Sequence, residues 1–433
     1  MSERPGPAVT APAGASAPPA VAPSGGLFRH RDFRLLWTGH TVSAVGSNMT
    51  AVALPLVAVA VLDASTFQVA VLTAAAWLPW LLAGLPVGAW VDRVRRRPVM
   101  IAADLVAAAL FAGVPVAALL DLLTVGHLLV VALGAGLARV FFETADQVYL
   151  PTLLPPEQVP PANARLHATQ TASYLLGPGL AGLIAQLAGA VTAVALDAVS
   201  FLASALCLHR IRAVEPHPRR AAGTVSLRRD VADGLRFVTR DPYLRVLTVF
   251  GAASNIGLTG YQAVLVVFLV RSAGLPPGLV GLLIGLASVG GVVGAALAAR
   301  LARRLGTARA LLLAGALTGP PALLIPLAGP GARVAWLVLG GALVSLGVAV
   351  GNVVKGSFRQ TYTPHRLLGR VTVSMHLLNY GTIPLAALLA GMLGAAWGPA
   401  GAIRLMTAWL ALTPLILLIG PLRRRHELPA APA

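Results

Sequence analysis

Twelve apolar stretches, each long enough for a helix that crosses a lipid bilayer, constrain this chain more than any other feature. A membrane-spanning helix needs about 20 apolar residues. The predicted spans cover residues 35–62, 66–91, 98–120, 122–147, 166–208 (two spans divided near Gly189), 246–270, 276–299, 310–327, 334–354 and 371–422 (two spans divided near Trp397, Gly398 and Pro399). Because 57% of the residues are hydrophobic and only 11% are charged, a soluble fold could not bury the apolar surface. The sequence therefore predicts an all-α polytopic membrane protein with twelve transmembrane helices.

The distribution of arginine predicts the orientation of the chain. The formal net charge is +18, but most arginines lie beside apolar stretches, so membrane topology explains them better than nucleic-acid binding. If both termini are cytoplasmic, nearly all arginines fall in cytoplasmic segments, as the positive-inside rule requires. We therefore expect a multi-pass protein of a bacterial cytoplasmic (inner) membrane that contacts the lipid bilayer, has no nucleic-acid partner and keeps both termini inside.

The spans divide into two pseudo-symmetric six-helix bundles. The expected organisation is a disordered arm (1–26), an N-terminal bundle (27–210), a cytoplasmic linker (211–242), a C-terminal bundle (243–422) and a cytoplasmic tail (423–433). The spacing of Gly88 and Arg97 recurs at Gly294 and Arg303. Such a duplication is typical of transporters in which one bundle rocks against the other around a central site.

The linker contains an amphipathic pattern. Leu227, Val231, Leu235 and Val238 recur at helical spacing, with arginines on the other positions. We expect a helix that either lies along the inner membrane surface or serves as a solvated connector between the bundles.

The segment after the second predicted span reads GAWVDRVRRR from Gly88 to Arg97. It resembles the loop motif between helices 2 and 3 of the major facilitator superfamily, with Gly88, Asp92, Arg93, Arg96 and Arg97 at the motif positions. An acid here can accept hydrogen bonds that break when the two halves separate, which makes the segment a candidate gating loop. The alternative is a topology signal, for which the arginines alone would suffice.

A second motif lies in the fifth span, where Gly177, Pro178 and Gly182 resemble the antiporter motif of the same superfamily. Together with the segment FRLLWTGH from Phe33 to His40, the motif resembles the drug:proton antiporter branch that includes macrolide and siderophore exporters. The resemblance implies outward transport of small lipophilic molecules in exchange for protons. The alternatives are an importer or facilitator of a small organic solute, and a membrane scaffold that transports nothing. The glycines also have a structural interpretation, because small residues let membrane helices approach closely.

Carboxylates are distributed unevenly between the halves. No Asp or Glu occurs between Pro242 and His426, so proton coupling through a carboxylate must use the first half. Arg139, Glu143 and Asp146 lie at i, i+4 and i+7, on one face of the fourth span. We hypothesise that Glu143, with Asp146 as the second candidate, exchanges protons, and that Arg139 links this step to substrate binding. The alternative is a self-neutralised ion pair near the inner end of the helix.

Further polar residues within the spans are candidates to line a substrate cavity. They are Asn48, Asn255, Gln262, Asn352, His376, Asn379 and Tyr380. Each has the alternative role of a hydrogen bond between helices, worth about 1 kcal/mol. One cysteine, no paired histidines at ligand spacing and no glycine-lysine nucleotide motif predict no metal site, no cofactor and no enzymatic activity. We expect a monomer that uses the proton gradient to move a small-molecule substrate.

Overall fold

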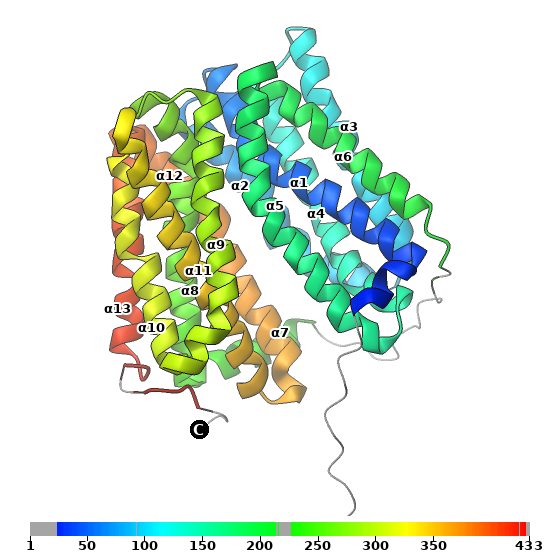
Figure 1. The fold of residues 1–433 in the computed structure, drawn as a ribbon, viewed down its shortest axis with the longest axis vertical. Helices are drawn as coiled ribbons and strands as arrows, with labels where there is room; N and C mark the ends of the chain where they lie inside the picture. Colours follow the sequence, from blue (N-terminus) through cyan, green and yellow to red (C-terminus); the bar gives the residue numbers. More distant parts are fainter. Residues whose placement is uncertain (1–23, 92, 214, 216–226, 424, 430–433) are drawn as a thin grey trace, which may run out of the picture.

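The computed structural model describes residues 24–429 apart from 92, 214, 216–226 and 424 (Figure 1). Most of the predicted arm and much of the predicted linker therefore lie outside the described residues. The described part is built from helices. Its α-helices are α1 (Arg31–Ala60), α2 (Thr66–Val91), α3 (Arg96–Leu119), α4 (Val125–Leu153), α5 (Val159–Ala188), α6 (Ala190–His209), α7 (Leu227–Arg240), α8 (Pro242–Val267), α9 (Pro277–Leu305), α10 (Thr307–Thr318), α11 (Val334–Tyr362), α12 (His365–Leu412) and α13 (Pro414–Ile419). Short helical turns complete the described chain: η1 (Ser24–Arg29), η2 (Pro156–Gln158), η3 (Phe268–Ser272), η4 (Pro320–Leu327) and η5 (Gly331–Arg333).

Eleven segments of the described chain are long and apolar enough to cross a membrane. One of them, Leu367–Ile419, has 53 residues, and at about 1.5 Å per residue a bilayer core takes only about 20 residues of helix. This segment therefore holds two spans. They are divided at Gly398, whose φ of 72° and ψ of 169° interrupt the helix and are accessible to glycine because it lacks a Cβ atom. The predicted class, an all-α protein with twelve transmembrane helices, is confirmed.

The spans assemble into two halves. In the N-terminal half, α1 packs against α5 and α6, α3 against α6, and α2 against α4. In the C-terminal half, α12 packs against α8, and α11 against α9 and α10. The main contacts between the halves are made by two helix pairs, α5 with α9 and α2 with α12 (Figure 1).

The halves are joined at one end of the molecule, which we call the closed face and define by Asp63 after α1 and Arg271 in η3. Arg271 donates a hydrogen bond to Asp63 across the boundary between the halves, with a distance of 2.5 Å. Beneath this pair a single apolar cluster runs through both halves and includes Leu56 of α1, Val264 of α8 and Leu283 of α9. The closed face is thus sealed by continuous apolar contact.

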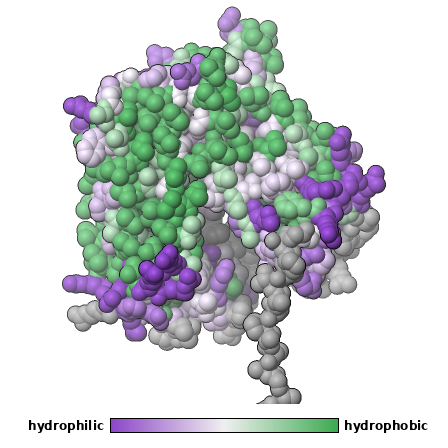
Figure 2. Space-filling view, in the orientation of Figure 1, coloured by the Kyte–Doolittle hydropathy of each residue, from purple (hydrophilic) through white to green (hydrophobic). Residues whose placement is uncertain are grey.

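At the opposite end the halves have separate cores. We call this end the basic face and define it by Arg93 after α2, Arg303 near the end of α9 and Arg423 near the C-terminus. One apolar cluster here belongs to the N-terminal half and includes Tyr149, and another belongs to the C-terminal half and includes Phe358. Figure 2 shows a hollow between the two halves toward this end and hydrophilic residues along its edge. The molecule is therefore open toward the basic face.

The linker helix α7 packs on α12. Gly234 of α7 lies so close to the backbone of Arg370 that a Cβ atom would meet its carbonyl carbon at 2.7 Å, and Val238 is buried. Beyond α7, Asp241 caps α8 by accepting from the N–H groups of Tyr243 and Leu244, and it also accepts from the Tyr362 hydroxyl at 2.6 Å. The described part of the linker is thus fastened to the C-terminal half.

Several helices, α4, α5 and α11 among them, extend further toward the basic face than their apolar stretches predict. α4 continues to Leu153, α5 begins at Val159 and α11 continues to Tyr362. The predicted limits at 147, 166 and 354 are short because hydropathy detects only the part of a helix that lies in lipid. The extra turns carry polar residues beyond the hydrocarbon core.

Candidate functional site

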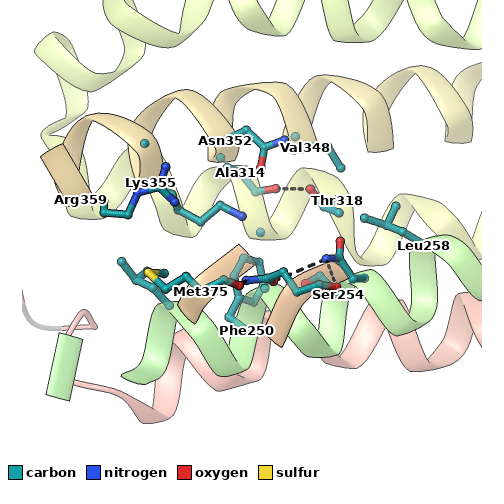
Figure 3. A pocket seen from close by; sticks show the side chains of 18 of the residues that line it. Phe250, Ser254, Leu258, Ala314, Thr318, Val348, Asn352, Lys355, Arg359 and Met375 are labelled. Carbon is teal, nitrogen blue, oxygen red and sulfur yellow. Dashed lines mark hydrogen bonds between the residues drawn. The ribbon is translucent and has the colours of Figure 1, made fainter. Parts of the chain in front are cut away.

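A cavity of about 330 Å³ lies inside the C-terminal half, among α8, α10, α11 and α12 (Figure 3). Four of the predicted cavity residues line it: Asn255, Asn352, Asn379 and Tyr380. Asn255 Nδ2 donates to the main-chain carbonyl of Asn379 at 3.2 Å, which ties α8 to α12. Much of the remaining wall is apolar and includes Phe250. The sequence therefore identified all three asparagines among the described residues that line this site.

Two cations on α11 face the same cavity. Lys355 and Arg359, one helical turn apart, both line it (Figure 3). Lys355 Nζ lies 5.6 Å from the centre of the Phe250 ring. Arg359 Nε is buried and has no hydrogen-bond partner among the described residues. Sequence reasoning missed both as cavity residues, although the single lysine of the chain beside an apolar span was an available signal.

The other three predicted cavity residues are placed differently. Asn48 Nδ2 donates to the Ala44 carbonyl of its own helix at 2.8 Å, and Asn48 abuts Gly177. Gln262 is exposed on α8 and does not line this cavity. The side chain of His376 lies outside the described residues.

The predicted coupling residues on α4 separate into two sites. Arg139 Nε donates to Glu143 Oε1 at 2.6 Å, and the Arg139 guanidinium lies 5.2 Å from the centre of the Trp77 ring. Asp146 instead approaches His40 of α1, with 3.9 Å between a carboxylate oxygen and Nδ1, and its Oδ1 is buried without a hydrogen-bond partner in the described chain. The pattern in sequence did not indicate His40 as a partner, because His40 lies on another helix.

Tyr380 connects these residues with the cavity. Its ring on α12 lies 5.9 Å from Trp77 and 6.2 Å from Trp80, both on α2. Trp77 also contacts Arg139. A chain of aromatic contacts therefore joins the Arg139–Glu143 pair in the N-terminal half to the polar cavity in the C-terminal half.

The glycines of the antiporter motif lie where α5 meets neighbouring helices. A Cβ atom on Gly177 would lie 2.5 Å from Asn48 Cβ of α1. One on Gly182 would lie 2.5 Å from the Gly278 carbonyl oxygen and 2.8 Å from Gly281 Cα, both on α9. Pro178 is buried between them. The motif thus permits the close contact of α5 with α9 that joins the halves at the closed face.

The predicted gating loop is described in part. Asp92 lies outside the described residues, so its proposed hydrogen bonds stay a prediction. A Cβ atom on Gly88 would have no neighbour within 4 Å, so close approach of another segment does not explain this glycine. Arg93 follows the end of α2 on the basic face.

Arg96 and Arg97 fasten the start of α3 to the linker. The main-chain N–H of Arg96 donates to Glu215 Oε1 at 2.8 Å, and that of Arg97 donates to Glu215 Oε2 at 3.3 Å. The Arg97 side chain donates to the carbonyls of Leu208 and His209 at the end of α6. Glu215 therefore caps α3, a role that sequence reasoning missed; an acid shortly after the sixth span was the only signal.

These features together define a class of protein. The two helical bundles are sealed together at the closed face, and a polar cavity lies on the side of the basic face. This is the architecture of a secondary transporter. Among the described residues no group of three or more His, Cys, Asp or Glu side chains could hold a metal ion.

The chain matches the family model described as Major Facilitator Superfamily over residues 36–382, and it belongs to that family. It is 30% identical over 395 residues to a protein named multidrug efflux pump Tap from Mycolicibacterium fortuitum, covering 89% of this chain and 93% of that protein. It is 24% identical over 222 residues to macrolide efflux protein A from Streptococcus pyogenes, covering 51% of this chain and 54% of that protein.

Solved structures show the same fold at low identity. A bacterial homologue of the iron transporter ferroportin in an inward-facing state gives a TM-score of 0.73 at 17% identity, covering 91% of this chain and 99% of that one. The outward-facing state of such a homologue gives 0.58 at 19% identity, covering 91% and 100%. The resemblance to the major facilitator superfamily inferred from the two motifs is confirmed.

Proposed function

We propose that this protein exports small lipophilic molecules across the cytoplasmic membrane in exchange for protons. The observation that carries the proposal is the nearly full-length similarity to a protein named multidrug efflux pump Tap. The macrolide efflux protein, similar over about half of the chain, supports the same direction of transport.

The way the halves meet supports alternating access. The closed face is sealed by one apolar cluster, whereas the two halves have separate cores at the basic face. Under the positive-inside rule the arginine-rich end is cytoplasmic, which puts both termini inside. The described conformation then accepts cargo from the cytoplasm, and rocking of the two halves releases it outside.

Proton coupling is assigned to the N-terminal half. The chain carries no Asp or Glu between Pro242 and His426. Glu143 is ion-paired with Arg139, and Asp146 has one buried oxygen without a described partner. Protonation of Glu143 would break its ion pair with Arg139 and free the guanidinium for another partner. Proton binding at Glu143 would in this way be linked to substrate binding. The proton gradient supplies the energy for transport, so the proposal requires no bound cofactor. A monomer is sufficient because each chain carries both halves.

Accumulation of a fluorescent efflux substrate in an efflux-deficient bacterial host tests the proposal. Cells that express the protein should accumulate less dye than control cells, and a protonophore should abolish the difference. Higher accumulation would favour the importer, and unchanged accumulation across a broad panel of drugs and dyes would favour the scaffold.

A further inference from the structure

Two of the described residues that line the cavity in the C-terminal half are cations, and none of them is an acid. Lys355 and Arg359 lie on one face of α11 and both line it. Two cations one turn apart repel each other, and charge that is partly buried in a cavity is costly unless something neutralises it. Their retention inside the C-terminal half therefore requires a partner.

The protein itself supplies no anionic partner in the described structure. Neither Lys355 nor Arg359 forms a salt bridge within the described chain. The aromatic ring of Phe250 attracts Lys355 but carries no net charge. Arg359 Nε is buried and lacks a hydrogen-bond acceptor among the described residues, although buried donors are normally satisfied.

The candidate acids are engaged elsewhere. Glu143 pairs with Arg139 in the N-terminal half, and Asp146 faces His40. Asp241, at the start of α8, accepts three hydrogen bonds from its own half. No carboxylate side chain occurs later in the chain before Glu427.

The remaining wall of the cavity is mixed. The amides of Asn255 and Asn352 supply polar groups, whereas Leu247, Phe250 and Leu258 supply apolar surface. The volume of about 330 Å³ is within the range of sites for small organic ligands. A ligand that matches this wall has an apolar body and one acidic group.

We propose that the cavity binds organic acids, with the acidic group of the cargo held by Lys355 and Arg359. The guanidinium of Arg359 matches a carboxylate in a bidentate geometry, and the ammonium of Lys355 supplies a second, more mobile contact. A lipophilic cation of the same size is disfavoured because it would meet two like charges. This proposal rests on the proposed export function and narrows its cargo to lipophilic anions.

Direct binding to the purified full-length protein tests the site without requiring transport. Fluorescence titrations in a neutral detergent compare 1-pyrenebutyrate with its methyl ester and with a pyrenylbutyl trimethylammonium salt. We expect the acid to bind roughly tenfold more tightly than either analogue, and added salt to reduce the difference. Equal binding of all three probes would overturn the proposal.

Substitutions assign the effect to the cavity. Lys355→Gln and Arg359→Gln should each remove most of the preference for the acid, whereas Lys355→Arg should keep it. Arg300→Gln removes the same charge from an exposed position on α9 and should change nothing. Where a variant is not monodisperse, the charge-conserving Arg359→Lys replaces it and should lower affinity for the acid through loss of the bidentate contact. An unchanged preference in these variants would refute the site.

Two further comparisons separate the remaining explanations. Short-chain phosphatidylglycerol added as a competitor should not displace the acid, and full displacement at equal concentration would assign the cavity to a lipid headgroup instead. Binding that depends on Lys355, together with unchanged dye accumulation in cells, would remove the export function and keep the site. Export of cationic dyes without binding of the acid would keep the export function and remove the proposed site.

Discussion

The contact between α5 and α9 allows a quantitative prediction about the balance between conformations. Gly182→Ala introduces a Cβ atom 2.5 Å from the Gly278 carbonyl oxygen and 2.8 Å from Gly281 Cα. Ordinary contacts between such atoms are about 3.5–4.0 Å, so the two helices must separate by roughly 1 Å. Overpacking of this kind costs about 1–3 kcal/mol. Because the cost arises only when the closed face is sealed, the substitution should favour conformations open at that face.

An energy of about 1–3 kcal/mol corresponds to a shift of roughly 5- to 150-fold in the ratio of two conformations. A cysteine introduced at position 66 can measure this shift in the ratio of conformations. Thr66 of α2 is only 7% exposed and lies against Gly394 of α12, so a reagent reaches this position when the closed face opens. In purified protein in which Cys207 has been replaced by alanine, Gly182→Ala should accelerate maleimide labelling of Thr66→Cys. Gly179→Ala is the matched control, since its Cβ would have no neighbour within 4 Å. Equal labelling rates in the two variants would refute the reasoning.

Three other predictions concern acidic residues. Glu215→Gln weakens the cap on α3, so the free energy of unfolding should fall by about 1–3 kcal/mol and a thermal melt should show a lower midpoint; an unchanged midpoint would mean that the cap carries no net stability. Asp92→Asn should reduce drug resistance in a susceptibility assay, whereas an acid introduced at Ala298 should not increase it; wild-type resistance in Asp92→Asn would reduce the loop to a topology signal. Glu143→Gln should abolish proton-driven uptake into inverted vesicles, and undiminished uptake would eliminate Glu143 as the coupling residue.

The sequence was sufficient to predict the membrane spans, because the apolar length that identifies them is a local property of the chain. Apolar length identifies a helix in lipid, and the glycine at 398 marks where one long helix becomes two. The same signal failed at the ends of α4 and α11, where polar turns continue the helix outside the hydrocarbon core.

The site was predicted less completely, because its contacts join distant parts of the chain. Asn255, Asn352, Asn379 and Tyr380 were identified, since polar residues within spans are conspicuous. Lys355 lies one residue beyond the predicted span 334–354, and only the arrangement of four helices shows that it faces a cavity. The bond from Glu215 to the start of α3 joins residues 119 positions apart, which no local pattern indicates.

The construction of the closed face determines which conditions can open it. Its ion pair is exposed, with the Asp63 side chain at 95% relative accessibility, and exposed pairs contribute only about 0–1 kcal/mol. The apolar cluster that includes Leu56, Val264 and Leu283 supplies the remaining contact. Burial of apolar surface changes the heat capacity, so its contribution to the seal depends on temperature. Salt screens charges and has little effect on apolar contacts. The seal at the closed face should accordingly respond to temperature and be nearly indifferent to ionic strength.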